Sequence, residues 1–399
     1  MLSLRSVIRL GTLNHAAVVI STAVAAASLS TTATLSDPPA LIKLKSERDP
    51  EKLFHLFKAN ARNRLVVENR FAFEDTVSRL AGARRFDYIE ELLEQQKGLP
   101  QGRREGFVVR IIMLYGNAGM YKHAINTFYD MHLFGCKRSV KSFNAALLVL
   151  TKTRDLVAIQ SFLDRVSFRF GISLDAYSFN IIIKAFCEMG LCDKACLVMA
   201  EMEKLGVKPD VITYTTLISA FYKNNGWEIG NGLWNLMVRR GCLPNLTTFN
   251  VRIQYLVSGR RVWQANSLMG MMRYLGIKPD EVTYNLVIKG FCVAGYMDMA
   301  KRVYSALHDE GSKPNAKIYQ TMIHYLCKAG DFDVAYTMCK DCMNKYRSLN
   351  VATIYMLLEG LKRNGKIQKV EYIITLAQNR VPPFPAQQVD VMKSILSRR

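Results

Sequence analysis

Four residues in the C-terminal half of the chain are of the types that bind zinc and activate water. His308 and Glu310 form an H-x-E pair, and Cys339 and Cys342 form a C-x-x-C pair. In sites of this kind the imidazole and both thiolates hold the metal, and the carboxylate moves protons during attack by a zinc-bound hydroxide. This chemistry is possible only if the surrounding elements bring the four side chains together.

The elements around these residues repeat every 35 residues. A proline and an aromatic residue show the period most clearly: Pro209, Pro244, Pro279 and Pro314, and Tyr214, Phe249, Tyr284 and Tyr319. A fixed period of this length is typical of a stacked array, in which each unit packs on its neighbours. The length of the chain therefore does not imply two or three globular domains.

Each repeat has the pattern of two helices joined by a turn. A threonine is placed to cap the first helix, at Thr213, Thr248 and Thr283. A break follows, near Asn225, Gly259, Gly295 and Gly330. The second helix carries a small residue that lets helices approach closely, at Gly230, Ala265, Ala300 and Ala335. The pattern predicts an all-α fold, a right-handed α-solenoid of stacked helix-turn-helix units.

The repeat phase divides almost the whole chain. We expect a partial first repeat over residues 37–69, a repeat array over residues 70–385 and a closing segment over residues 386–399. The units of the array should begin near residues 70, 105, 140, 176, 211, 246, 281, 316 and 351.

The same phase argues against the zinc site. Both halves of the pattern fall inside the second helices of consecutive units, and Met338 stands where the zinc pattern has proline. Cys342 shares its repeat position with Met202 and Met237, which indicates packing. Too few residues follow the array to build the αβ domain of a zinc deaminase. We therefore expect no enzyme activity, no metal and no cofactor.

Residues 1–36 have the composition of a transit segment. They contain Arg5 and Arg9, many Ser, Thr and Ala, and no acidic residue before Asp37. This composition favours the mitochondrial matrix, with the chloroplast as the alternative because the two signals overlap. The apolar run over residues 16–27 is too short for a membrane span, and we expect none elsewhere.

The charge of the chain indicates a polyanionic partner. Lys and Arg number 54 against 33 for Asp and Glu, although a basic matrix protein without such a partner is the competing interpretation. Four lysines share one repeat position and should follow one edge of the stack, as a phosphate backbone requires: Lys137, Lys208, Lys278 and Lys313.

Several recurring positions together resemble a known family. The period, the D/N-x-x-T-Y/F-N/T start and the KPD or LPN end are similar to pentatricopeptide repeats of the P class over about residues 70–385. TFNVRIQYL at 248–256 and YQTMIHYLCKAGDFDVAYTMC at 319–339 resemble the short plant mitochondrial members that associate with the mitochondrial ribosome.

The resemblance implies that single-stranded RNA is bound with one base per repeat, read by the fifth and the last residue of each unit. The implied pairs are Asn144 with Asp175, Asn180 with Asp210, Thr215 with Asn245, Asn250 with Asp280, and Asn285 with Asn315. The second residues would pack against base faces: Lys141, Tyr177, Ile212, Thr247 and Val282. The family's code then implies U-U-A-U-C/U from 5′ to 3′.

The outer units depart from that code. Glu74 with Arg104 and Val109 with Ser139 match no known pair, so we expect these units to cap the stack or to touch something other than a base. We predict an RNA-binding protein of, or associated with, the mitochondrial ribosome, with rRNA or mRNA and mitochondrial ribosomal proteins as partners. A site-specific RNA processing or stability factor and a TPR-like protein scaffold are the alternatives.

Overall fold

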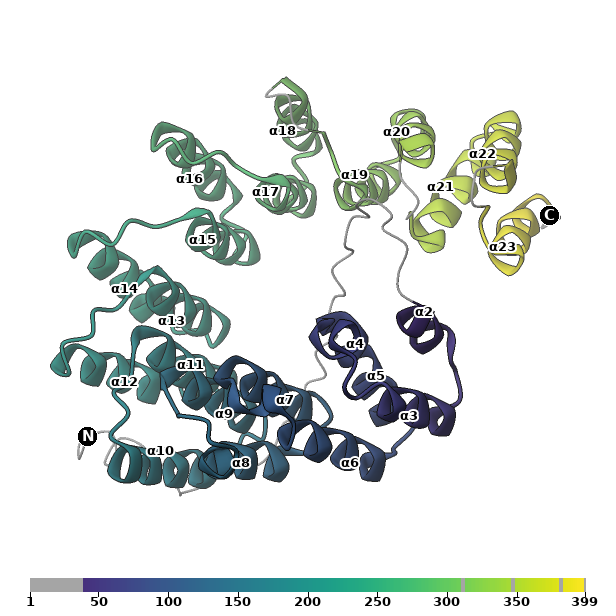
Figure 1. Cartoon of the computed structure of the whole chain (residues 1–399). Coiled ribbons are helices and arrows are strands. Elements are labelled where there is room, and N and C mark those ends of the chain that lie inside the picture. The colour runs from purple at the N-terminus through teal and green to yellow at the C-terminus, as the bar shows by residue number, and fades with distance from the viewer. Residues whose placement is uncertain (1–38, 310–312, 346–348, 380–382, 398–399) are drawn as a thin grey trace. The chain divides into compact units, whose positions relative to one another are not determined.

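The computed structural model describes residues 39–309, 313–345, 349–379 and 383–397. Within these residues the regular structure consists of α2 to α23 and two short 3-10 helices, without a strand (Figure 1). The predicted all-α class is therefore confirmed. The predicted transit segment, residues 1–36, lies outside the described residues.

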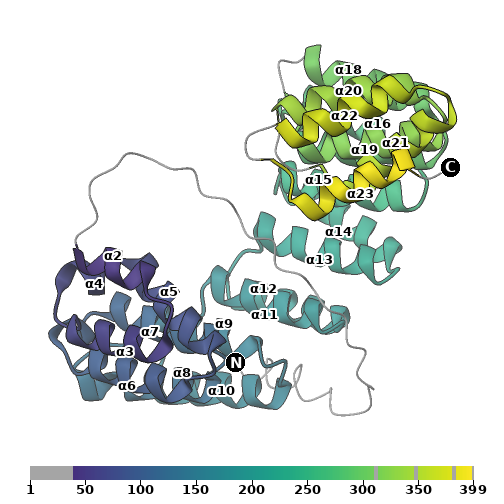
Figure 2. The same ribbon diagram turned by 90° about the vertical axis from the view of Figure 1, so that its right-hand side faces the viewer.

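The chain divides into two compact units, Met1–Ala220 and Phe221–Arg399. The first unit contains α2 (Pro39–Ser46), α3 (Pro50–Ala59), α4 (Arg64–Glu68), α5 (Arg70–Gly82), α6 (Phe86–Lys97), η1 (Pro100–Arg103), α7 (Glu105–Asn117), α8 (Tyr121–Asp130), η2 (Met131–Phe134), α9 (Val140–Thr151), α10 (Leu156–Phe170), α11 (Ala176–Glu188) and α12 (Cys192–Lys204). The helices α5, α7, α9 and α11 pack in one row, each also contacting the helix that follows it. Figure 2 shows one such pair, α11 and α12, lying side by side.

The second unit repeats this arrangement after α13 (Val211–Lys223), in which the boundary falls. It contains α14 (Trp227–Arg239), α15 (Leu246–Ser258), α16 (Val262–Tyr274), α17 (Glu281–Val293), α18 (Met297–Asp309), α19 (Ala316–Lys328), α20 (Phe332–Lys345), α21 (Val351–Arg363), α22 (Ile367–Asn379) and α23 (Ala386–Ser397). In Figure 1 the first helices α15, α17, α19 and α21 form an inner row, and the second helices α16, α18, α20 and α22 lie on its outer side. The last helix, α23, packs on α21 and α22.

The first helices that carry the recurring threonine start differently from the prediction. Asn245 is the N-cap of α15 and its side chain accepts the backbone N–H of Thr248 at 3.0 Å. Thr248 is the third helical residue, and its hydroxyl accepts the backbone N–H of Asn245 at 3.3 Å. The prediction that the threonine is the cap was wrong, because the preceding Asn or Asp offers the better acceptor to the exposed N–H groups.

The turn between the two helices needs a left-handed residue. Gly295 and Gly330 have φ of 85° and 81°, and Asn225 has φ of 60°. In the remaining unit Arg260, with φ of 57°, takes this conformation instead of Gly259. The left-handed residue is thus the one after Gly259, near which the break was predicted, and Arg260 carries the strain that glycine would avoid.

Small residues and aromatic residues are buried where the helices of each pair pack together. Ala265, Ala300 and Ala335 are fully buried. A Cβ at Gly230 would lie 2.6 Å from the ring of Tyr222, so a side chain here would have to displace that ring. The recurring aromatic residue of each first helix is at most 1% exposed, as at Tyr214, Phe249, Tyr284 and Tyr319.

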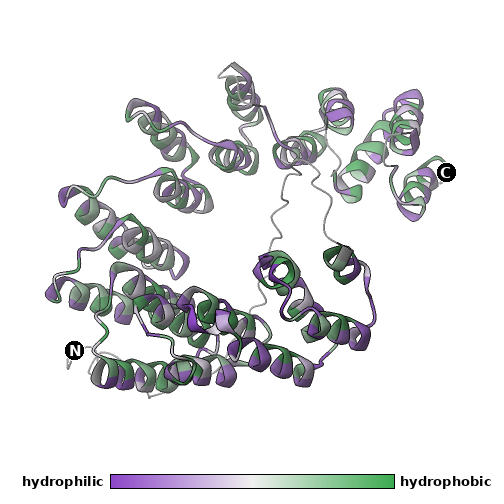
Figure 3. Cartoon of the chain, viewed as in Figure 1, coloured by the Kyte–Doolittle hydropathy of each residue, from purple (hydrophilic) through white to green (hydrophobic). Residues whose placement is uncertain are grey.

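Each helix therefore has an apolar side, and Figure 3 shows hydrophilic and hydrophobic residues on the same helices. Burying such apolar faces is the main favourable term in stacking. No helix in the described ranges is both long enough and apolar enough to cross a membrane.

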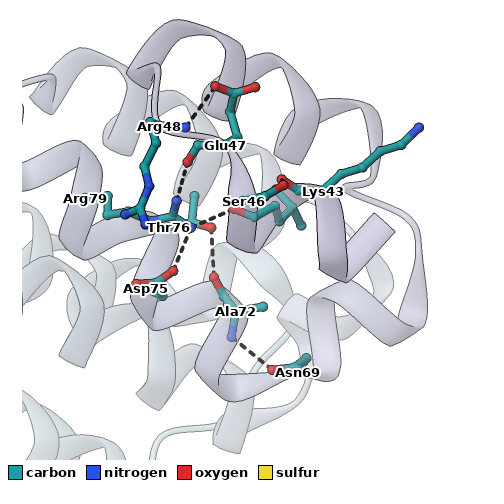
Figure 4. Close-up of polar contacts among 10 residues, drawn as sticks. Lys43, Ser46, Glu47, Arg48, Asn69, Ala72, Asp75, Thr76 and Arg79 are labelled. Carbon is teal, nitrogen blue, oxygen red and sulfur yellow. Dashed lines mark hydrogen bonds and ion pairs between the residues drawn. The ribbon is translucent and has the colours of Figure 1, made fainter. Parts of the chain in front are cut away.

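The N-terminal helix α2 is hydrogen-bonded to α5 through one arginine, Arg79 (Figure 4). Arg79 donates to the backbone oxygens of Glu47 at 2.5 Å and of Leu44 at 2.7 Å, and its guanidinium also pairs with Asp75 at 2.6 Å. Arg79 thereby satisfies carbonyl groups at the C-terminal end of α2, which lack partners within that helix.

Candidate nucleic-acid interface

Three of the implied residue pairs are joined by direct hydrogen bonds. In each, the asparagine Nδ2 donates to an aspartate oxygen, at 3.1 Å for Asn144 and Asp175, 3.1 Å for Asn180 and Asp210, and 3.2 Å for Asn250 and Asp280. The asparagine lies on a first helix, and the aspartate lies at the start of the next first helix. The stacking of consecutive repeats therefore builds each pair.

A hydroxyl group completes each of these three sites. The hydroxyls of Ser178, Thr213 and Thr283 donate to the oxygens of Asn144, Asn180 and Asn250, each at 2.6 Å. The amide thus has its oxygen toward the hydroxyl and its nitrogen toward the carboxylate. One N–H and one lone pair of each amide are left for another partner.

The sequence pattern predicted only a helix cap for Thr213 and Thr283, and it did not single out Ser178. Their role in orienting the amide follows from the stacking of one repeat on the next. It is shared by the serine of one unit and the threonines of two others, because either side chain supplies the same hydroxyl.

The carboxylates of Asp175 and Asp280 are held in their charged form. Burial by itself raises the pKa of Asp175, but the backbone N–H and hydroxyl of Ser178 and the amide of Asn144 outweigh it and lower that pKa. The pKa of Asp280 is lowered in the same way by Thr283 and Asn250, against the effect of burial. A charged aspartate fixes the asparagine amide more firmly than a neutral acid would.

The side chains beside these amides are exposed. Asn144 and Asn180 are only 5% and 8% exposed, whereas Tyr177, Ile212 and Val282 are 56%, 60% and 55% exposed. Lys141 and Thr247 are exposed as well. A recessed amide next to a protruding side chain suits a flat ligand with a polar edge, such as a nucleobase.

The implied pair of Asn285 and Asn315 is not formed. The amide of Asn315 donates to the carboxylate of Glu281, and its oxygen caps α19 by accepting the backbone N–H of Ile318 at 3.0 Å. The oxygen of Asn285 accepts the hydroxyl of Thr321 at 2.9 Å. In this repeat the fifth residue, Asn285, is therefore hydrogen-bonded to Thr321 and not to the last residue of the repeat.

The remaining implied pair, Thr215 with Asn245, has one residue in each compact unit. Thr215 is half-buried on α13, and Asn245 caps α15. Their use in base reading stays a prediction.

A glutamate also replaces the coding pair in an outer repeat. Glu105 accepts the backbone N–H and the hydroxyl of Ser139 at 2.9 and 2.7 Å, and the backbone N–H of Ser142 at 3.3 Å. Val109, the fifth residue of that repeat, offers no hydrogen bond. In the preceding repeat Glu74 is paired with Arg70 at 2.8 Å.

The lysines predicted to follow one edge are exposed at Lys137, Lys208, Lys278 and Lys313. A second set was missed by the sequence analysis. Three exposed lysines share one repeat position at the end of a first helix, Lys152, Lys223 and Lys328. Each is the thirteenth residue of its unit, counted from residues 140, 211 and 316, and this shared position is the signal that could have found them.

The cysteines of the zinc-like pattern are buried packing residues. Cys339 and Cys342 are both 0% exposed, and burial raises the pKa of Cys339. His308 is exposed, and Glu310 lies outside the described residues. Among the described residues, no group of three His, Cys, Asp or Glu side chains is arranged to hold a metal.

The repeats match a known family. Residues 174–223, 209–257 and 244–293 match the PPR repeat family, and residues 110–136, 282–312 and 317–345 match the PPR repeat. The chain is 69% identical over 202 residues to a mitochondrial pentatricopeptide repeat-containing protein of Arabidopsis thaliana, covering 51% of each chain. It is 37% identical over 221 residues to the Arabidopsis small ribosomal subunit protein mL103 (rPPR7), covering 54% of this chain and 53% of the relative.

A solved structure has the same fold. The crystal structure of the pentatricopeptide repeat protein PPR10 from maize aligns with a TM-score of 0.52 and 17% identity, over 90% of this chain and 59% of that one. The matched segments span about half the length of the curated relatives.

Proposed function

This chain is built of pentatricopeptide repeats, and we propose that it binds single-stranded RNA along its first helices, with one base per repeat. The proposed role is binding without catalysis. The recessed asparagine amides would contact base edges, and the exposed second residues would pack on base faces.

One observation carries this proposal. The sites around Asn144, Asn180 and Asn250 have the same three-part geometry, with an aspartate on the nitrogen and a hydroxyl on the oxygen. A helix-start residue without a ligand needs no such orientation, because the aspartate alone satisfies the cap. The repeated geometry favours a ligand that is itself repetitive.

We also propose that the protein acts in mitochondria, in association with the mitochondrial ribosome. The name of the 69% identical relative places that protein in mitochondria, and rPPR7 is named as a ribosomal subunit protein. The sequence U-U-A-U-C/U would occur by chance about once per 500 nucleotides, so it selects a transcript poorly. A small number of base contacts is sufficient for a protein that is also bound by neighbouring proteins.

RNA binding is tested with short oligonucleotides. We expect the protein to bind an RNA containing UUAUC more tightly than a scrambled RNA, and the affinity to fall steeply with salt. Equal affinity for both RNAs would remove the base-reading proposal. Binding of peptides without RNA would favour a protein scaffold.

The ribosomal association is tested by sedimenting mitochondrial lysate with and without RNase and then mapping crosslinks to RNA. We expect the protein to sediment with ribosomal subunits and to crosslink to rRNA. Protein confined to soluble fractions and crosslinked to one messenger would support the alternative, a site-specific processing or stability factor.

A further inference from the structure

Arginines line a cavity at the N-terminal end of the repeats. The cavity has a volume of about 340 Å³ and lies between α4 and η1. Its charged lining consists of Arg62, Arg64, Arg104 and Glu68. The wall formed by η1 is closely packed on α6, because a Cβ at Gly102 would lie 2.0 Å from the backbone oxygen of Lys97.

The positive charge of this region exceeds its negative charge. Glu68 is shared by Arg64 at 3.0 Å and Arg104 at 3.6 Å. Nearby, Arg70 pairs with Glu74 at 2.8 Å. Arg62 has no ion pair within the described residues. With Arg110, this region contains five arginines and two glutamates.

Arg110 lies close enough to Arg70 and Arg104 to be repelled by their positive charges. Its Nη1 donates to the backbone oxygen of Val67 at 2.7 Å, which holds the guanidinium beside α4. Burial, followed by repulsion from Arg70 and then from Arg104, lowers the pKa of Arg110. Like charges held this close favour the binding of an anion between them.

The cavity lies in the register of the base-reading sites. Arg104 is the last residue of its repeat, the position that Asp175 and Asp210 occupy in theirs. The fifth residue of the same repeat is Glu74, already paired with Arg70. This repeat therefore presents a guanidinium group where the later repeats present an aspartate, and a carboxylate where they present an oriented amide.

We propose that this arginine cavity binds a phosphate group of the RNA on the 5′ side of the bases that the later repeats read. The proposal rests on the proposed function. Guanidinium groups bind phosphate oxygens through paired N–H donors, and such a contact adds affinity without reading sequence. The first repeats would then hold the RNA backbone and leave base selection to the repeats from Asn144 onward.

The test compares the variant Arg62→Ala/Arg104→Ala with the unchanged protein on an RNA that extends several nucleotides 5′ of UUAUC. We expect affinity to fall at least tenfold, by a similar factor for a scrambled RNA. The slope of log affinity against log salt should become shallower by about 0.7 for each lost phosphate contact. A matched control, Arg165→Ala/Arg302→Ala, removes the same charge from α10 and α18 and should change affinity much less.

Two further RNAs identify the source of the phosphate. If the cavity holds an internal phosphodiester, the loss requires the 5′ extension and is independent of the 5′ end group. If it holds a terminal phosphate, the loss occurs with a 5′-phosphate RNA and disappears with a 5′-hydroxyl RNA. Either result supports the proposal.

The proposal is overturned if the variant Arg62→Ala/Arg104→Ala binds both RNAs with the affinity and salt slope of the unchanged protein. Its thermal melting curve must then also match that of the unchanged protein. If the unchanged protein still prefers UUAUC in that case, only this inference fails. If the unchanged protein binds no RNA, the proposed function fails with it.

Discussion

The side-chain amide of Asn315 donates a hydrogen bond to the carboxylate of Glu281, the first residue of the same repeat. In the repeats where an aspartate holds the asparagine, the first residue is apolar, as at Val140, Ala176 and Leu246. A carboxylate at the first position therefore competes with the fifth residue for the last residue of the repeat.

This competition leads to a prediction for the fifth base. Asn315→Asp alone places two carboxylates together, so we expect little gain in preference for U. Glu281→Ala/Asn315→Asp removes the competitor and should favour U by roughly 1–3 kcal/mol, the range for a matched base contact. The measurement is affinity for RNAs that differ only in the fifth base. Equal U preference in the single and the double variant would contradict the role of Glu281.

A second prediction concerns the third base. Thr215→Asn/Asn245→Asp should change the preferred base from A to U, because it introduces the pair found at Asn180 and Asp210. The expected discrimination is again roughly 1–3 kcal/mol, measured by a gel-shift series over the four bases. Each single substitution serves as a control and should give a weaker change. An unaltered preference for A would remove the code from this repeat.

A third prediction concerns acid stability. The pKa values of Asp175 and Asp280 are lowered from the ordinary 3.8. Their contribution to the free energy of unfolding is therefore present above about pH 4 and is lost as the pH falls through the lowered values. Asp175→Asn/Asp280→Asn retains a capping side chain and should lose less stability than the unchanged protein between pH 6 and pH 3.

Urea denaturation at the two pH values measures this difference. Glu371→Gln, an exposed substitution on α22, is the control and should behave like the unchanged protein. An identical pH dependence in the double variant would show that these carboxylates do not contribute to the acid sensitivity.

A fourth prediction concerns Cys339 and Cys342. Since both side chains are 0% exposed, Cys339→Ala/Cys342→Ala should lower the free energy of unfolding, on the order of 1 kcal/mol per site by analogy with small core truncations. RNA affinity should not change. Metal analysis of the purified protein should find no stoichiometric zinc, and one zinc per chain would reverse the interpretation of these residues as packing.

Much of the fold was determined by the sequence alone. The 35-residue period, with a proline before each first helix and a break before each second helix, predicts helix pairs because each feature acts within a few residues. Local signals were less reliable at single positions. The N-cap of α15 is Asn245 and not the predicted Thr248, and the left-handed turn residue is Arg260, a position that the predicted break near Gly259 did not specify.

The partners of each polar side chain were decided only by the tertiary structure. The period places Asn285 and Asn315 in the same phase as Asn180 and Asp210, yet only the second pair forms. A hydrogen bond depends on every donor and acceptor within reach, including Glu281 and Thr321 from neighbouring turns and repeats. The arginine cavity has the same origin, because stacking brings Arg62 and Arg104 together across 42 residues of sequence.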